Sequence, residues 1–334
     1  MSKQPVLSIK DLDVRYYTDA GLVYANNDIN FELYPGERLG LVGESGSGKS
    51  TLALAILGMI KRPGRITGGE IWLDGVDITK LDEEGTRRIR GRNISMIPQG
   101  AMNSLNPVMR IKDQIIDSMI DHELDLSEQK MAEMANEALE AVELDKRVGS
   151  MYPHELSGGM KQRACIAISI AMHPKVIIAD EPTSALDVIT QRQVMQTIGR
   201  LQDQMGAAVI LIGHDMGLMA QFVSRMAVMY AGRMMELARV EDMFRQALHP
   251  YSQMLISSLP RLENKGVFQG IPGITPLLRD LPSGCVFNPR CPQAISVCSQ
   301  VVPKLNEYRP EQWASCHLYD SEVAHNDGTP ARTA

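Results

Sequence analysis

Short apolar runs separated by glycine, proline and polar residues recur along the chain and predict the strands of a buried sheet. The runs at 176–180 (Val-Ile-Ile-Ala-Asp) and 208–212 (Ala-Val-Ile-Leu-Ile) are nearly continuous, as in parallel strands buried on both faces. Residues 38–42 show the same pattern. Further strands are expected at 6–17, 28–33, 69–75 and 95–98, and a strand pair at 228–236 turning at Ala231-Gly232. The pattern predicts an α/β fold.

The chain changes character between about residues 100 and 165, where the apolar spacing becomes helical. In the segment 127–144, Met131, Ala135, Ala138 and Val142 recur at helical intervals, as does Met134, and Ser127 is suited to cap the helix. We interpret this stretch as a helical subdomain inserted into the α/β core. After residue 245, proline and cysteine become more frequent and periodicity weakens, which indicates a separate C-terminal module. The polar end, about 325–334, is expected to be disordered.

Residues 43–51, Gly-Glu-Ser-Gly-Ser-Gly-Lys-Ser-Thr, fit the pattern G-x-x-x-x-G-K-[ST]. The run 38–42 before them predicts a strand, and the apolar segment 52–60 after them predicts a helix. A strand, a glycine-rich loop and a helix together cradle phosphates, because the loop and the helix N-terminus both present backbone N–H groups. Lys49 would reach the β- and γ-phosphates, and Ser50 would hold Mg²⁺. The alternative is a glycine-rich turn without a ligand.

Composition and charge limit the classes of partner that this chain could bind directly. The 334 residues carry a net charge of −6, so no basic excess favours nucleic acid binding. The start of the chain, Met-Ser-Lys-Gln-Pro, has no apolar signal core, and no apolar run reaches the roughly 18–20 residues of a membrane span. We expect a cytosolic protein in which any membrane role comes through partners.

Further polar groups follow the predicted strands. Asp180-Glu181 ends one strand, where the first carboxylate could hold Mg²⁺ and the second could act as a general base on water. The alternative is an acidic loop. Gln99 and His214 also follow strand-like runs and could contact Mg²⁺, water or the γ-phosphate; each could equally be an ordinary polar residue.

A second glycine turn, Leu156-Ser-Gly-Gly-Met160, precedes an apolar helical stretch. Ser157, Gly158 and Gly159 therefore predict a second anion site, and a simple helix cap is the alternative. Two phosphate sites in one chain favour a dimer in which each site meets its complement.

The order of these segments, with Ser184-Ala-Leu-Asp187 added, resembles the ATP-binding subunit of an ABC transporter over about residues 5–240. The resemblance implies a P-loop NTPase core at about 1–95 and 166–245, with the helical subdomain at 96–165 and an extension at 246–334. It implies an ATP-binding Walker A loop made of Gly43, Glu44, Ser45, Gly46, Ser47, Gly48, Lys49, Ser50 and Thr51.

The same resemblance gives roles to residues around the bound nucleotide. Tyr16 would stack on adenine, and Gln99 would be the Q-loop residue. Asp180 and Glu181 would be the Walker B aspartate and the catalytic base. Ser50, Gln99 and Asp180 would hold Mg²⁺.

Three further motifs complete the implied site. Asp187 would be the D-loop residue and His214 the switch histidine. Ser157, Gly158 and Gly159 would be the signature, which closes on ATP held by the opposite subunit.

Two features indicate one subfamily, that of dipeptide, oligopeptide and nickel importers. Met160 stands where most ABC proteins have Gln, as in peptide importers, and the segments 249–251 and 284–291 resemble their C-terminal region. The implied function is ATP hydrolysis that drives solute import, with peptides first and nickel or oligosaccharides as alternatives. The implied partners are a homologous second ATPase subunit, two membrane permease subunits and an extracytoplasmic solute-binding protein, at the cytoplasmic face of the membrane. The rival classes are a soluble ABC ATPase and an exporter subunit.

Four of the five cysteines, Cys285, Cys291, Cys298 and Cys316, fall within 32 residues, whereas Cys165 lies in an apolar helical stretch and is expected in the core. Four clustered thiols in a cytosolic protein favour a metal over disulfides, but the spacing lacks the C-x₂-C pairs of common zinc sites. The resemblance implies a [4Fe–4S] cluster as in some dipeptide importers, with zinc or free and disulfide-bonded thiols as alternatives and His317 as a spare ligand.

Overall fold

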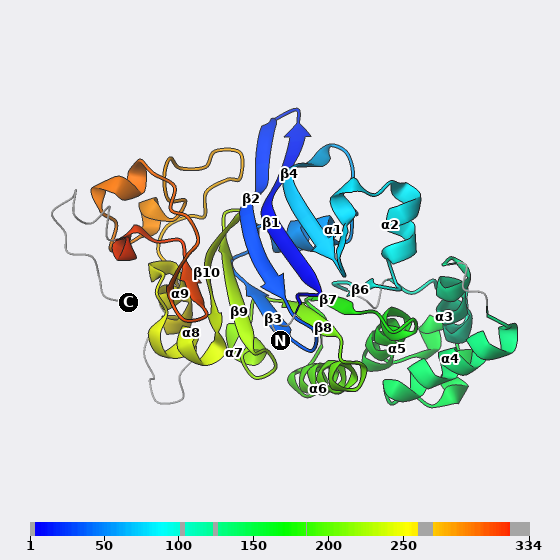
Figure 1. Cartoon of the computed structure of the whole chain (residues 1–334). Helices are drawn as coiled ribbons and strands as arrows, with labels where there is room; N and C mark the ends of the chain where they lie inside the picture. Colours follow the sequence, from blue (N-terminus) through cyan, green and yellow to red (C-terminus); the bar gives the residue numbers. More distant parts are fainter. Residues whose placement is uncertain (1–3, 101–103, 123–125, 185, 260–269, 321–334) are drawn as a thin grey trace. The chain divides into compact units, whose positions relative to one another are not determined.

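The computed structural model describes residues 4–100, 104–122, 126–184, 186–259 and 270–320, and the chain divides into two compact units. Unit 1 comprises residues 1–8, 32–38 and 72–212. Unit 2 comprises residues 9–31, 39–71 and 213–334. Figure 1 shows the chain with its elements labelled. The predicted disordered end at 325–334 lies outside the described residues.

Unit 1 contains three parallel strands, β6 (Ile94–Ile97), β7 (Val176–Asp180) and β8 (Ala208–Ile212). Val176 pairs with Ile94 on one side and with Ala208 on the other, and every residue of β7 and β8 is buried. The two continuous apolar runs are therefore buried parallel strands, as predicted. The short strand β5 (Val76–Asp77) pairs separately with Trp72 and Leu73.

The described residues of this unit form five helices: α2 (Glu83–Ile89), α3 (Ile111–Ile120), α4 (Glu128–Ala141), α5 (Gly158–Ile170) and α6 (Val188–Met205). Helices α3, α4 and α5 pack against one another, and the Ser169 hydroxyl ties α5 to the sheet by donating to the Met96 carbonyl at 3.0 Å. Ser127 caps α4 as predicted, by accepting from the Lys130 N–H at 3.2 Å. The helix ends at Ala141, before the predicted Leu144, because Glu143 has a φ of 60°.

Unit 2 holds most of β1 (Leu7–Thr18), β2 (Gly21–Leu33) and β4 (Gly64–Leu73), which lie in the order β2-β1-β4. Strand β2 starts at Gly21, well before the predicted residue 28. The pattern hid its first half because two buried asparagines interrupt it, and each bonds a carbonyl: Asn26 that of Gly48 at 3.1 Å, and Asn27 that of Tyr24 at 3.0 Å.

A second sheet in this unit begins with β3 (Arg38–Val42), parallel to β9 (Arg225–Tyr230). It continues through antiparallel strands β10 (Arg233–Arg239), β12 (Gln312–Ala314) and β11 (Asn306–Arg309). The predicted turn at Ala231-Gly232 connects β9 to β10. Because Glu236 pairs with Ala314, the C-terminal residues extend the sheet that β3 begins.

The helices of unit 2 are α1 (Lys49–Ile56), α7 (Met216–Met219), α8 (Val240–Gln246) and α9 (Pro250–Ser257). The predicted helix at 52–60 is α1, which starts and ends earlier. Short 3₁₀ turns complete the two units: η1 (Ile78–Lys80), η3 (Lys146–Ser150) and η4 (Pro153–Glu155) in unit 1, and η5 (Asn288–Arg290), η6 (Ser296–Ser299) and η7 (His317–Tyr319) in unit 2. Within the described residues, no helix has the length and apolar character needed to span a bilayer.

Candidate functional site

The loop between β3 and α1 has a backbone that only glycine adopts readily. Gly43 and Gly48 have φ values of 149° and 97°. A Cβ atom on Gly48 would lie 2.3 Å from the Ala25 carbonyl oxygen, and one on Gly43 would lie 2.1 Å from that of Met229. The glycines therefore let the loop pass close to neighbouring backbone, which is how a phosphate-binding turn is formed.

Lys49 is the first residue of α1, and the residue as a whole is only 8% exposed. The ammonium donates to the carbonyls of Gly43 at 2.8 Å and Glu44 at 2.9 Å, and to the Ser47 hydroxyl at 3.2 Å. These bonds curl the loop around one positive charge. Ser50 and Thr51 follow in the first turn of α1, where Ser50 is exposed and available to a ligand. The predicted strand, loop and helix are confirmed.

The loop also contacts residues from the far end of the chain, which the sequence did not reveal. Glu44 forms an ion pair with Arg290 at 2.8 Å, and the Glu44 N–H donates to the Tyr251 hydroxyl at 3.1 Å. Burial alone would raise the pKa of the Glu44 carboxyl, but bonds from Arg290 and Thr275 and the charge of Lys49 hold that pKa below its ordinary value. Arg290 and Tyr251 stand inside the two C-terminal segments already singled out, although nothing in their spacing identifies Glu44 as the partner.

In unit 1, two of the predicted catalytic residues, Glu181 and Gln99, come together at the end of β7. Asp180 is buried as the last residue of the strand, and Glu181 follows with a φ of 43°, a conformation uncommon for a residue with a side chain. The Glu181 N–H donates to the Ile212 carbonyl at 2.9 Å, and its carboxylate accepts from Gln99 Nε2 at 2.7 Å. This strained turn aims the Glu181 side chain at Gln99, which suits a carboxylate kept in place to act on water.

The second glycine turn has a simpler geometry. Ser157 caps α5, and its hydroxyl accepts from the Met160 N–H at 3.3 Å. A pocket in unit 1 is lined by the whole turn from Ser157 to Met160 and by Asp187 and Thr190 of the next helix. Asp187 caps α6, and its bonds to Thr190 and Ile189 hold the pKa of its carboxyl below the ordinary value. The structure thus places two of the predicted motifs, the signature and the D-loop, around one hollow.

Two other predicted residues lie in unit 2. His214 is exposed just after β8, and Tyr16 of β1 packs against Gly64, where an added Cβ would lie 2.6 Å from its ring. Their roles, switch histidine and adenine platform, stay predictions.

The four C-terminal cysteines line a single small cavity together with His317, Phe287 and Leu318. Three of them are buried, and burial raises the pKa of Cys285 to about 11 and that of Cys316 to about 12. None of the five cysteines forms a disulfide, and Cys165 is buried in α5 as predicted. His317 Nε2 lies 2.8 Å from the Val301 carbonyl. Among the residues that the structure describes, no three His, Cys, Asp or Glu side chains are placed to hold one metal ion.

Comparison with known proteins identifies two family regions in this chain. A family model described as ABC transporter matches residues 26–184, and one described as oligopeptide/dipeptide transporter, C-terminal region matches residues 235–298. The oligopeptide transport ATP-binding protein OppD of Escherichia coli is 44% identical over 315 residues, which are 93% of this chain and 92% of that protein. OppD of Haemophilus influenzae is 43% identical over 94% of this chain and 97% of that protein.

Solved structures agree with these relatives. The dimeric ATP-binding cassette MJ0796, in a post-hydrolysis state with ADP and Pi, has a TM-score of 0.63 and 28% identity, covering 70% of this chain and 98% of that one. The fold is that of a P-loop ABC ATPase with mixed α/β content. Since the OppD likeness covers nearly the whole chain and both family models match in order, the protein belongs to the ABC transporter ATP-binding proteins, in the oligopeptide and dipeptide group.

Proposed function

We propose that this chain is the ATP-binding and ATP-hydrolysing subunit of a membrane importer of di- or oligopeptides. The observation that carries the proposal is the phosphate loop, in which Lys49 is held at its centre by three oxygens. The relatives named above are oligopeptide transport ATP-binding proteins, which supports peptides as the cargo. Nickel and oligosaccharides are the alternative cargoes.

The proposed mechanism assigns each residue a task. Lys49 and the loop N–H groups bind the β- and γ-phosphates. Ser50, Asp180 and Gln99 would hold Mg²⁺ or its water shell, and the cation would neutralise phosphate charge. Glu181 accepts a proton from water as its oxygen attacks the γ-phosphorus and ADP leaves. Its 2.7 Å bond from Gln99 supports this role, because Gln99 fixes one carboxylate oxygen. His214 would contact the γ-phosphate and Tyr16 the adenine.

The proposed assembly is a dimer of ATPase subunits, because the signature turn forms only part of an ATP site. Ser157, Gly158 and Gly159 form a helix N-terminus that lines a pocket together with Asp187, and such a terminus attracts anions. We propose that it closes on ATP bound by a homologous second ATPase subunit. ATP binds the closed dimer more tightly than the open one, and this difference drives the two permease subunits. The chain then works at the cytoplasmic face of the membrane, with a solute-binding protein outside delivering cargo.

The domain organisation proposed with this function keeps the predicted boundaries. The ATPase domain covers 1–245, with a core at 1–95 and 166–245 and a helical subdomain at 96–165, and the extension covers 246–334. The mutual packing of α3, α4 and α5 supports the helical subdomain. The match of residues 235–298 to the C-terminal family region supports the extension.

We also propose that the four cysteines at 285, 291, 298 and 316 hold a [4Fe–4S] cluster. All four line one cavity, which suits a cluster whose Cys₄ set surrounds four irons rather than one. Zinc is the alternative, although its common sites carry C-x₂-C pairs that the spacing of these cysteines lacks. Iron and acid-labile sulfide at about four atoms each per chain, lost in Cys298→Ser, would support the cluster; stoichiometric zinc without iron would replace it.

Uptake of a labelled dipeptide by the native host tests the main function. Lys49→Ala should abolish uptake, because the phosphates lose the cation at the centre of the loop. Glu181→Gln should also stop uptake yet trap ATP in closed dimers, because it keeps binding and removes the base. Near-normal phosphate release in Glu181→Gln would exclude Glu181 as the base.

The same experiment separates the alternatives. Unchanged uptake in Lys49→Ala, in a host without a second dipeptide system, would favour nickel or an oligosaccharide as the transported solute. A chain that never fractionates with membranes would instead favour a soluble ABC ATPase.

A further inference from the structure

Glu44 places a carboxylate within the phosphate loop itself. It is the second residue of the loop, and its backbone carbonyl accepts from the Lys49 ammonium at 2.9 Å. The Glu44 side chain is 24% exposed, so water screens its charge only in part. A negative charge in this position would repel the phosphates of a nucleotide bound by the loop. The loop therefore requires a compensating cation.

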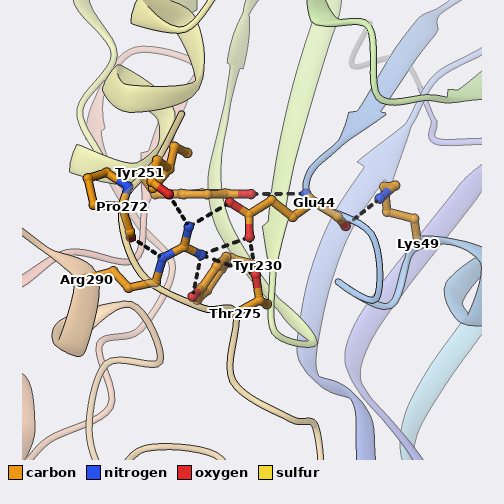
Figure 2. A network of polar contacts seen from close by, with 8 residues as sticks. Glu44, Lys49, Tyr230, Tyr251, Pro272, Thr275 and Arg290 are labelled. Carbon is orange, nitrogen blue, oxygen red and sulfur yellow. Dashed lines mark hydrogen bonds and ion pairs between the residues drawn. The ribbon is translucent and has the colours of Figure 1, made fainter. Parts of the chain in front are cut away.

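Arg290 supplies that cation from the C-terminal region. Its Nη1 donates to Glu44 Oε2 at 2.8 Å and its Nη2 donates to Glu44 Oε1 at 3.1 Å, a bidentate pair (Figure 2). The Arg290 side chain is only 6% exposed. A buried guanidinium that meets a carboxylate with both arms is a fixed arrangement rather than a passing surface contact.

The remaining donors of Arg290 hold it in this orientation. Nε donates to the Pro272 carbonyl at 2.8 Å, Nη2 to the Ile271 carbonyl at 3.0 Å and Nη1 to the Tyr230 hydroxyl at 3.0 Å. Burial lowers the pKa of the Arg290 guanidinium, but its bonds to Glu44 and Tyr230 outweigh burial and raise that pKa, so it stays charged. Every nitrogen of the group thus has an oxygen partner, and its position does not depend on Glu44 alone.

Aromatic packing places the turn that carries Arg290. Tyr230, Tyr251 and Phe287 are fully buried, with ring centroids 4.7 to 5.3 Å apart. Phe287 precedes the η5 turn that ends at Arg290, and the Tyr251 hydroxyl accepts from the Glu44 N–H. The same aromatic cluster therefore positions both partners of the ion pair.

We propose that Arg290 is a positioning residue for the nucleotide: it cancels the Glu44 charge and thereby makes the phosphate loop accept ATP. The inference rests on the proposed ATP-binding function and adds a task for the C-terminal region. It predicts that the affinity of the loop depends on the balance of charge between these two side chains.

MgATP binding to the full chain, measured by calorimetry, tests this with a double-mutant cycle. Arg290→Gln should raise the dissociation constant about tenfold, as expected for one uncompensated charge at a partly exposed site. Glu44→Gln should lower it, because Arg290 then adds an unbalanced positive charge. The double variant should regain most of the MgATP affinity that Arg290→Gln loses. The Arg290→Gln defect should be smaller for ADP and should shrink at high salt.

A merely structural brace gives a different pattern. If Arg290 only supported the loop, Glu44→Gln and the double variant would bind as weakly as Arg290→Gln at any salt concentration. That pattern would overturn the proposal, as would an MgATP dissociation constant for Arg290→Gln within about twofold of that of the original chain. If Arg290→Gln does not fold, Glu44→Gln alone decides: tighter binding supports the charge role and weaker binding overturns it.

Two controls separate this inference from the proposed function. Arg279→Gln removes one positive charge from the same C-terminal segment, where Arg279 pairs with exposed Asp280 at 3.1 Å, and it should bind MgATP like the original chain. A loss equal to that of Arg290→Gln would overturn the specific role of Arg290. If the unaltered chain does not bind MgATP, the proposed function fails and the inference fails with it.

Discussion

The phosphate loop and the signature turn are both glycine-containing turns that precede a helix, yet they are constructed differently. In the phosphate loop, Gly43 and Gly48 have positive φ and press against other backbone, and Lys49 fills the turn with three bonds. In the signature, Gly158 and Gly159 are ordinary helical residues behind a serine cap. The first turn cannot form without glycine, and the second could form with other residues.

Their surroundings differ in the same sense. Side chains from far along the chain fix the phosphate loop, among them Arg290 and Tyr251, so its shape and charge are set within unit 2. The signature turn lines an open pocket, and Ser157 itself is exposed. The phosphate loop is therefore ready for its ligand within a single chain. The signature turn instead lines a pocket at the start of α5, where the proposed closure on a second subunit would bring ATP.

The largest effect should come from Gly48→Ala. The added Cβ would meet the Ala25 carbonyl at 2.3 Å at a φ of 97°, so we expect a loss of about 3 kcal/mol in the free energy of unfolding and loss of MgATP binding. Urea unfolding and calorimetry measure the two quantities.

Gly159→Ala is the matched control in the signature turn. Its Cβ would lie 3.2 Å from Thr190 Cγ2 with ordinary helical backbone, so stability should change by less than about 1 kcal/mol. Equal losses in the two variants would contradict the contrast between a strained and an unstrained turn.

A smaller effect is expected from Ser157→Ala. Removing the cap of α5 should cost about 1 kcal/mol in the free energy of unfolding. Ser127→Ala removes an equivalent cap from α4 in the same unit and should cost a similar amount. Under the proposed function, only Ser157→Ala should also slow ATP hydrolysis in the assembled transporter. Equal hydrolysis by the two variants would leave Ser157 with a capping role alone.

Much of the fold could be predicted from local patterns because the pattern and the burial coincide there. Strands β7 and β8 are buried on both faces, so their apolar runs are uninterrupted, and Ser127 begins α4 as a standard cap. Strand β2 shows the opposite case. Burial of Asn26 and Asn27 is tolerated because specific carbonyls accept hydrogen bonds from their side-chain amides. No local sequence pattern predicts such partners.

The candidate site likewise has one part that the local sequence predicts and another that only the tertiary structure reveals. Local sequence is sufficient to specify the phosphate loop, because glycine, lysine and serine at that spacing dictate backbone freedom, charge and a hydroxyl within a few residues. The order of motifs along the chain is likewise enough to reveal the family. Folding is needed to bring Glu44 to Arg290, 246 residues further along the chain, and Gln99 to Glu181. Such pairs form when packing brings distant segments together, so their energy depends on distance and burial that the linear pattern does not contain.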